Sequence, residues 1–448
     1  MLNDMTTGKP FKAILSMSIP ILFGNLFQQF YAMTDAVIVG RILGQNALAA
    51  VGATGALYNM ILWFVTGTAG GFAVAIAQNF GAGNYQRMRE RLYQSVILSV
   101  ILTIITTVLG ITFIRQLLVF MNTPGEILED ACSYVLVILG GLIATMVYNL
   151  AAAVLRALGD SKTPLYFLIM TSILNIVLDI LFIRSFHMGT SGAAWATVIS
   201  QAVSGVLCVW YMYRKFEILH IKKEDCKCSK NDLSYMLGLG LPLGLNGVVT
   251  ASGVIVFQFA INSFGTEAVA AYTAAIKVDA IVTQPLAAYS ITMVNYVGQN
   301  YGAGKIWNIK NGVRQCFWLI ILTGVAGGIL MVTCGGMFAG LFLDSSSMTV
   351  IAYAQEYLKI DGLFLVAFGM LCMYRSAAQG MGDSKIPIIN GVLESVSRII
   401  WTVYLVHYGD FHQLCYANPM TWLLATMILV ILYRRKIRKV ELQMGGCA

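Results

Sequence analysis

The chain has 448 residues, of which 58% are hydrophobic and 11% are charged, and its formal net charge is +8. A soluble globular domain carries about 25% charged residues, so this composition excludes an ordinary soluble protein and indicates one that is embedded in a lipid bilayer. The positive charge does not indicate nucleic-acid binding, because its distribution along the chain follows the expected membrane topology.

Apolar runs long enough to cross a bilayer recur along the whole chain, and a spanning helix needs about 20 such residues. In chain order, spanning helices are expected at 14–38, 47–77, 92–114, 131–155, 165–183, 192–213, 234–264, 268–297, 313–343, 350–374, 387–406 and 417–433. We therefore predict an all-α integral membrane protein with twelve transmembrane helices.

The basic residues are distributed unevenly between the two sides of this topology. With a cytoplasmic N-terminus and alternating helices, 23 Lys and Arg residues fall in inside segments, whereas only Arg41, Arg115 and Arg184 fall outside. Because Lys and Arg accumulate in cytoplasmic loops, this split predicts a multi-pass protein of the cell (plasma) membrane, or inner membrane, with both termini in the cytoplasm.

Two short phrases are written twice, at nearly the same spacing. GDSKTP at 159–164 returns as GDSKIP at 382–387, an offset of 223, and QNFGAG at 78–83 returns as QNYGAG at 299–304, an offset of 221. We infer two copies of a six-helix unit, which are parallel repeats because six is even. The predicted division is an N-terminal lobe at 1–213, a cytoplasmic linker at 214–232 and a C-terminal lobe at 233–448.

Both phrases fall in expected cytoplasmic loops and contain turn-forming residues. In GDSKTP, Gly and Asp suit a turn, Thr163 is expected to cap the next helix, and Pro164 is expected at its first position. The glycines of QNFGAG allow a sharp turn. We expect these loops to shape the two halves rather than to contact substrate.

Two carboxylates are expected at the same membrane depth in the first half. Asp35 lies six residues before Arg41 and Asp179 lies five before Arg184. At 1.5 Å per residue, both acids lie roughly 8–9 Å inward of the outer boundary. Acids within a membrane are costly and usually mark an ion or substrate pathway.

Further polar residues are expected near these acids. Asn175 lies one helical turn from Asp179 and shares its face. Tyr134 and Thr197 fall at a similar depth, whereas Gln28 and Asn149 are expected deeper in the membrane.

The repeated loops, the two six-helix halves and the early stretch MTDAVIVGRILGQNALAAVG resemble the multidrug and toxic compound extrusion family. The resemblance implies a V-shaped pair of six-helix bundles that exports organic, often cationic, compounds in exchange for protons or sodium ions. Six residues match the polar cluster of the family branch whose N-terminal half binds the coupling cation: Asp35, Tyr134, Asn149, Asn175, Asp179 and Thr197. The resemblance thus implies a possible sodium site at Asp35, Asn175 and Asp179, and no other metal.

The repeat also allows the two halves to be compared. The local offsets take Asp35 to Phe257 and Asp179 to Thr402, so the second half lacks both acids at those positions and coupling chemistry is expected only in the first half. Glu394 and Arg398, spaced i, i+4, are expected to neutralise each other. The weaker candidates for the substrate cleft are Gln28, Lys277, Asp361, Glu394 and Arg398.

The function expected from these features is secondary antiport of amphiphilic organic compounds by alternating access. No phosphate loop is complete, since YGAGKI lacks the required Ser or Thr, so no ATPase domain is expected.

No enzyme activity or cofactor is expected. The expected partners are small organic substrates and the lipid bilayer, without nucleic acid, and the protein is expected to act as a monomer. The alternative is a flippase of the same superfamily for a lipid-linked oligosaccharide or another lipid; an oligosaccharide flippase would be expected to place several cationic residues in its cleft.

Overall fold

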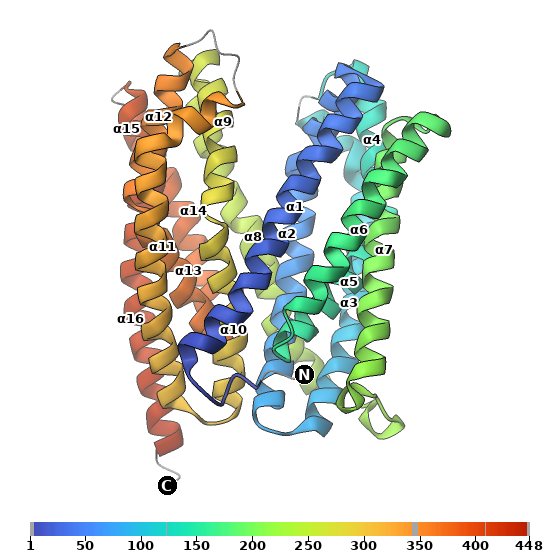
Figure 1. The fold of residues 1–448 in the computed structure, drawn as a ribbon, viewed down its shortest axis with the longest axis vertical. Helices are drawn as coiled ribbons and strands as arrows, with labels where there is room; N and C mark the ends of the chain where they lie inside the picture. Colours follow the sequence, from blue (N-terminus) through green and yellow to red (C-terminus); the bar gives the residue numbers. More distant parts are fainter. Residues whose placement is uncertain (1–3, 122, 343–347, 408, 446–448) are drawn as a thin grey trace. The chain divides into compact units, whose positions relative to one another are not determined.

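The computed structural model describes residues 4–121, 123–342, 348–407 and 409–445, and every regular element in these ranges is helical (Figure 1). The helices of the first half and the linker are α1 (Pro10–Leu43), α2 (Gln45–Gly81), α3 (Tyr85–Phe120), α4 (Gly125–Gly140), α5 (Leu142–Ala157), α6 (Lys162–Ile180), η1 (Leu181–Ser185), α7 (Gly189–Lys215), η2 (Glu217–Leu219) and η3 (Lys223–Asp225). The second half contains α8 (Lys230–Asn262), α9 (Thr266–Val282), α10 (Gln284–Gly302), α11 (Ile306–Gly340), α12 (Met348–Leu363), α13 (Leu365–Gly380), α14 (Lys385–Val406), α15 (Phe411–Leu414) and α16 (Ala417–Gly445).

By length and hydropathy, nine helical segments of the described residues qualify as membrane spans, and two bent pairs raise this number to eleven. The bent pairs are α4 with α5, at 49°, and α12 with α13, at 50°. The span expected at 268–297 corresponds to α9 and α10, which are separated at Thr283 just before Pro285. Proline removes a backbone donor and crowds the preceding turn, which explains this break. The all-α, two-repeat membrane fold predicted from the sequence is confirmed.

The chain packs into two compact units. Among the described residues, unit 1 contains those within 23–244, and unit 2 contains those within 4–22 and 245–445. Helices α1 and α8 therefore each pass from one unit to the other. The passage follows Pro20 in α1 and Pro242 in α8 by two or three residues, at points where proline interrupts the helical hydrogen bonds. The division at 1–213, 214–232 and 233–448 concerns the repeats and stays a prediction.

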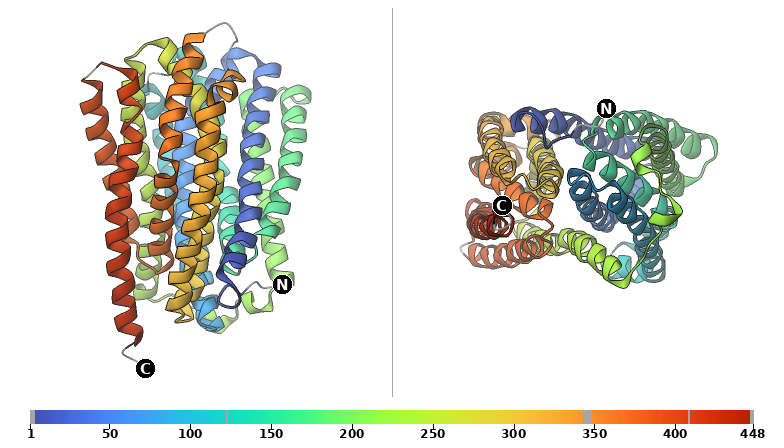
Figure 2. Two further views of the ribbon diagram at one scale, coloured as in Figure 1. Left: turned by 60° about the vertical axis from the view of Figure 1, so that its left-hand side comes forward. Right: turned by 90° about the horizontal axis from the view of Figure 1, so that it is seen from below.

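Each unit has its own apolar core, and its helices run side by side (Figures 1 and 2). In unit 1, α2 packs on α3 and α5, while α7 packs on α4, α5 and α6. Met236 and Leu239 of α8 belong to this core. In unit 2, α11 packs on α12 and α13, and Ile14, Met17 and Ile21 of α1 are buried in the core.

The GDSK loops cap their helices through aspartate. Gly159 has a φ of 82° and Gly382 a φ of 75°, values that favour glycine. Asp160 Oδ1 then accepts from the backbone N–H of Thr163 at 3.0 Å, and Asp383 Oδ1 accepts equivalently from Ile386 at 3.2 Å. The expected cap at Thr163 was wrong, because its hydroxyl donates to Asp160 Oδ2 instead.

The position predicted for Pro164 also differs in the structure. Because α6 begins at Lys162, Pro164 is the third helical residue rather than the first.

The second glycine motif holds the start of unit 2. Gly304 has a φ of 71° and lies two residues after the end of α10. Gln299 Oε1 accepts from the backbone N–H of Met5 at 2.9 Å, and Asn300 Nδ2 donates to the Met5 carbonyl at 3.1 Å. Lys305 Nζ donates to the carbonyl of Thr6 at 2.9 Å. The motif and the lysine that follows it therefore fix residues 5 and 6, in addition to forming a turn.

Candidate functional site

The centre of the candidate site in unit 1 is a pair of carboxyl groups from different helices. Asp35 lies on α1 and Asp179 on the last turn of α6, and their side chains are within hydrogen-bonding distance of each other. Asp179 is completely buried, and the Oδ1 atoms of both residues are buried without a hydrogen-bond partner. The equal depth estimated from the sequence thus corresponds to direct contact.

The residues around Asp179 form a short hydrogen-bond chain. In the amide orientation that satisfies its neighbours, Asn175 Nδ2 donates to Asp179 Oδ2 at 2.9 Å, and Asn175 Oδ1 accepts from the backbone N–H of Thr197 at 3.2 Å. Thr197 Oγ1 lies 3.2 Å from the hydroxyl of Tyr31. Asn175 therefore fixes the orientation of one carboxyl group, and the hydroxyl of Tyr31 joins α1 to α7.

Three tyrosines complete the surroundings of the pair. Tyr31, Tyr58 and Tyr134 are close enough to Asp35 to interact with it electrostatically. Tyr134 is buried, as expected for a residue of this site. Tyr31 and Tyr58 were not identified from the sequence, although Tyr31 lies one helical turn before Asp35 on the same face.

Two residues that the sequence analysis placed near this site, Asn149 and Gln28, make no contact with the acids in the structure's hydrogen bonds. Asn149 Oδ1 accepts from the hydroxyl of Thr66 at 3.3 Å, and Asn149 Nδ2 donates to the carbonyl of Thr145, so its amide joins α2 to α5. Gln28 is exposed on α1. Neither residue is part of the hydrogen-bond chain around Asp179.

A second carboxyl pair lies in unit 2. Asp279 of α9 and Asp361 of α12 are within hydrogen-bonding distance of each other. Both Asp361 oxygens and Asp279 Oδ1 are buried without a hydrogen-bond partner. Each acid lies just before a helix break: Asp279 is four residues before the break at Thr283, and Asp361 is three residues before the break at Phe364. Both acids therefore lie in the last turn of a helix, next to a break in the chain of helices.

An arginine and two tyrosines surround this second pair. Arg398 is close enough to Asp361 for an electrostatic interaction, as are Tyr272 and Tyr357. The rings of Tyr272 and Tyr357 meet edge to face at 5.3 Å between centroids. Asn418 Nδ2 donates to the hydroxyl of Tyr357 at 3.3 Å. Unlike the pair in unit 1, this pair has a cationic neighbour.

The sequence comparison of the two halves missed this pairing because it searched only for acids at positions equivalent to Asp35 and Asp179. Those positions hold Phe257, which packs edge to face on Tyr272 at 5.5 Å, and Thr402. A usable signal was present, since Tyr357 follows Tyr134 by 223 residues, the offset of the GDSK motifs. Each of these equivalent tyrosines lies beside a carboxyl pair.

The expected self-neutralising pair on α14 has different partners in the structure. Glu394 Oε1 lies 3.5 Å from Arg375 Nη1 and accepts a hydrogen bond from Asn390. Arg398 Nη1 donates to the carbonyl of Thr250 at 3.5 Å, and its Nε is buried without a partner. The i, i+4 pairing was wrong because helix packing brings Arg375 of α13 to Glu394.

Lys277 of α9 is exposed, and its ammonium group lies 5.2 Å from the ring centroid of Phe342. This contact is a cation–π interaction.

Buried carboxyl groups in contact have a restricted set of ionisation states. Two ionised carboxylates at this distance in a low-dielectric setting repel strongly, so the pair favours a proton or another cation between them. A hydrogen bond between two carboxyl groups requires at least one proton. Within the described residues, no group of three or more His, Cys, Asp and Glu side chains gathers as a metal site would. The arrangement is suited to reversible cation binding rather than to covalent chemistry.

These features define a class of protein: a multi-span membrane transporter built from two six-helix repeats, with two acidic pairs that each contain one buried aspartate. Comparison with known proteins narrows this class. The MatE family model matches residues 20–181 and again 242–404, and the chain belongs to this family. It is therefore a transporter and not an enzyme.

The chain is similar to curated proteins over most of its length. It is 28% identical over 371 residues to "Probable multidrug resistance protein YpnP" of Bacillus subtilis, covering 82% of each chain. It is 26% identical over 402 residues to "Probable multidrug resistance protein NorM" of Thermotoga maritima, covering 88% of this chain and 84% of the relative.

Solved structures support the same fold. An outward-facing multidrug resistance MATE family transporter of the MOP superfamily superposes with a TM-score of 0.92 at 24% identity, over 98% of both chains. A MOP superfamily transporter from Pyrococcus furiosus, described as having a binding pocket of reverse polarity, has a TM-score of 0.91 at 25% identity, also over 98% of both chains.

Proposed function

We propose that this protein is a secondary active efflux antiporter that exports amphiphilic, often cationic organic compounds in exchange for protons. Membership of the MatE family and the names of the curated relatives support export of multiple compounds. The observation that carries the choice of antiport is the pair of buried Asp179 and half-buried Asp35, with a buried, unpartnered oxygen on each carboxyl group. The proposal places both termini in the cytoplasm and takes the monomer as the active form.

The close approach of the two carboxyl groups favours the proton over sodium as the coupling ion, because one proton can be shared between them. Asn175 turns its amide oxygen to the backbone N–H of Thr197, so this oxygen is not directed at the carboxyl pair. The charged oxygen ligands left for a metal ion are then those of the two acids, with the tyrosine hydroxyls around them as neutral ligands. A proton needs only these two acids, and its arrival from outside lowers the negative charge of the pair by one and removes the repulsion between two ionised carboxylates.

The exchange of substrate for protons follows because both are attracted to the negative charge of the carboxyl pair. A cationic substrate is attracted by the deprotonated pair, and each proton that binds to the pair weakens that attraction. Because the acids lie on α1 and α6, neutralising their repulsion also changes how these helices pack. Alternating access of a repeat-built transporter converts this competition into exchange of one ligand for the other.

A lipid-linked oligosaccharide flippase is the alternative function. It is favoured by one observation, the buried guanidinium of Arg398 in unit 2, whose Nε has no partner. The nearby Asp361 offsets this charge, however, and the acids in unit 1 have no such neighbouring cation among their described contacts. This charge balance supports export of cations over transfer of an anionic lipid.

The proposal is tested by efflux from proteoliposomes. A fluorescent organic cation is loaded, and its efflux is followed under an imposed proton gradient or an imposed sodium gradient. We expect proton-driven efflux in the wild type and its loss in Asp35→Asn and in Asp179→Asn. Glu126→Gln, which removes an exposed acid from the same unit, is the matched control and is expected to keep wild-type efflux.

Two other results would contradict this proposed function. Efflux driven only by sodium would overturn proton coupling. Proton-driven efflux that persists in both Asn variants would make the acids structural, and the flippase function would then be tested with a labelled lipid-linked oligosaccharide.

A further inference from the structure

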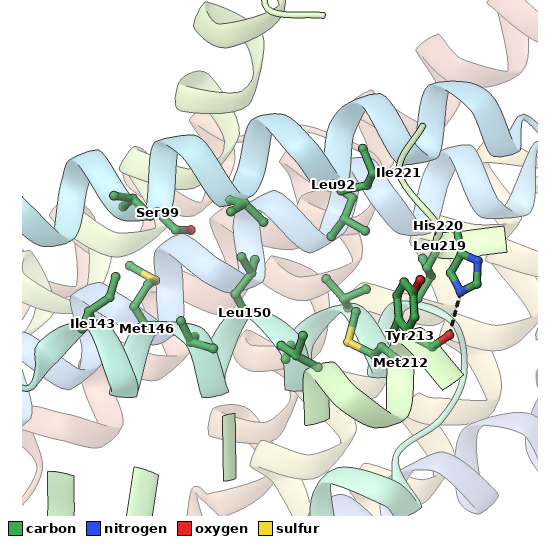
Figure 3. Close-up of a pocket in the computed structure, with 16 residues that line it drawn as sticks. Leu92, Ser99, Ile143, Met146, Leu150, Met212, Tyr213, Leu219, His220 and Ile221 are labelled. Atoms are coloured by element: carbon green, nitrogen blue, oxygen red, sulfur yellow. Dashed lines mark hydrogen bonds between the residues drawn. The ribbon is translucent and has the colours of Figure 1, made fainter. Parts of the chain in front are cut away.

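Unit 1 contains an apolar cavity that is separate from the acidic pair. It has a volume of about 430 Å³ and is lined by α3, α5, α7 and the residues that follow α7 (Figure 3). This volume is within the range of about 300–1,000 Å³ typical of ligand sites. The walls are formed largely by Leu, Ile, Val, Met and Ala side chains, among them Met146 and Leu150.

The cavity is elongated along the helices. On α5 its lining extends from Ile143 to Val154, eleven residues apart, which corresponds to roughly 16 Å of helix. One leaflet of a bilayer contributes half of a hydrocarbon core about 30 Å thick, or roughly 15 Å. The length of the cavity therefore matches that of one leaflet, and its apolar walls match a hydrocarbon chain.

The linker crosses one end of the cavity and is held there by specific contacts. Leu219 lines the cavity and is also buried in the apolar core of unit 1. His220 Nε2 is 2.6 Å from the carbonyl oxygen of Tyr213, and the two rings stack with centroids 4.4 Å apart (Figure 3). Asp225 forms an ion pair with Arg89 of α3 at 2.7 Å. The end of the cavity next to the linker is thus built from an ordered segment.

Basic residues border this end of the cavity. Arg214 and Lys215 directly follow the lining residue Tyr213, and Lys222 and Lys223 directly follow the lining residue Ile221; all four are exposed. The same stretch, 214–224, contains only two acids, at 217 and 224. Clusters of Lys and Arg at a membrane surface attract anionic lipid headgroups. The cavity therefore combines a hydrocarbon-lined slot with a cationic rim.

We propose that this cavity binds an acyl chain of an anionic phospholipid of the cytoplasmic leaflet, whose headgroup contacts Lys222 and Lys223. The chain lies along α5 between α3 and α7, and the headgroup holds the linker to unit 1. The site is distinct from the acidic pair and from the export of substrate.

The site is tested by photo-crosslinking the full chain in lipid nanodiscs. Phosphatidylglycerol with a photoreactive diazirine in its acyl chain is irradiated, and the labelled peptides are identified by mass spectrometry. We expect labelling of the α3, α5 and α7 segments that line the cavity. Val209→Trp, which fills the cavity from α7, is expected to reduce this labelling to background. Val325→Trp on α11 is the matched control, because Val209 and Val325 are equally exposed, at 48%.

The headgroup contact is tested without altering the core. Lys222→Gln combined with Lys223→Gln is expected to weaken capture of the phosphatidylglycerol probe by roughly 30-fold, the scale set by two charges near an anionic membrane surface. Capture of a phosphatidylcholine probe with the same acyl chains is expected to be weak and unchanged. Equal capture of both probes by the wild type, or unchanged labelling in Val209→Trp, would overturn the proposal. Displacement of the probe by the fluorescent export substrate would also overturn it, since the cavity would then belong to the export pathway.

Discussion

Helices α2 and α8 approach each other closely in unit 1. We therefore expect an added methyl group to destabilise the protein at Gly71 of α2 and to stabilise it at the neighbouring Gly70. A Cβ atom at Gly71 would lie 2.6 Å from Gly240 Cα and 2.6 Å from the carbonyl oxygen of Leu239. Ordinary contact begins at 3.4 Å, so the two backbones would have to separate by about 0.8 Å. Neither neighbouring atom can rotate away, because both belong to the backbone of α8. Small residues commonly permit such close helix packing within membranes.

The loss of stability expected for Gly71→Ala follows from the cost of overpacking. Inserting one methyl group into a tightly packed core costs about 1–3 kcal/mol. For Gly71→Ala we expect about 2 kcal/mol, which lowers the unfolding midpoint by about 4–8 °C for a unit of this size. Gly70→Ala is the matched control on the same helix, since no atom lies within 4 Å of its added Cβ. Alanine is favoured over glycine in a helix by about 1 kcal/mol, so this control is expected to raise the midpoint.

The assay is thermal unfolding of the purified full chain in one detergent, followed by intrinsic fluorescence at one heating rate. A fixed rate is needed because unfolding of large proteins is often irreversible and the midpoint then depends on the rate. If Gly71→Ala unfolds at or above the midpoint of Gly70→Ala, the close packing of α2 on α8 is refuted.

Two further predictions concern other parts of the molecule. The ion pair with Arg89 lowers the pKa of Asp225 below its usual value of about 3.9, so the ionised carboxylate stabilises the folded linker above that pH and the stabilisation is lost as the pH falls through the lowered pKa. Cleavage of the linker by pepsin is therefore expected to increase as the pH is lowered from 4 towards 2 in the wild type and to be high throughout in Asp225→Asn; equal cleavage of the two proteins at pH 4 would contradict this role. In unit 2, Asp361→Asn removes one acid of the second pair. This change is expected to lower proton-driven efflux about 5-fold or more, since coupling between two binding sites usually changes affinity by at least that factor. If the variant keeps wild-type efflux, the pair of Asp361 with Asp279 has a structural role only.

The predicted elements that were confirmed depend on local sequence. Apolar runs of about 20 residues have few alternatives to a spanning helix, because backbone polar groups within a membrane must be hydrogen-bonded internally. The two-repeat organisation was visible in the repeated loops because glycine at positive φ and a capping aspartate are requirements of the backbone itself. Asp35 and Asp179 were found together because each lies a similar number of residues from an outer arginine, and helical rise converts that number into depth.

The sequence by itself determined the helices, the repeat and the depth of the first carboxyl pair, since each of these depends on residues near one another along the chain. Only the tertiary structure decided which side chains meet across helices. It brought Asp279 to Asp361, gave Glu394 the partner Arg375 rather than Arg398, and turned Asn149 towards Thr66. These contacts depend on the rotation of each helix about its axis and on breaks such as the one at Thr283. Helix rotation is set by packing against neighbours, and a sequence pattern of 3.6 residues does not specify which neighbour a face will meet.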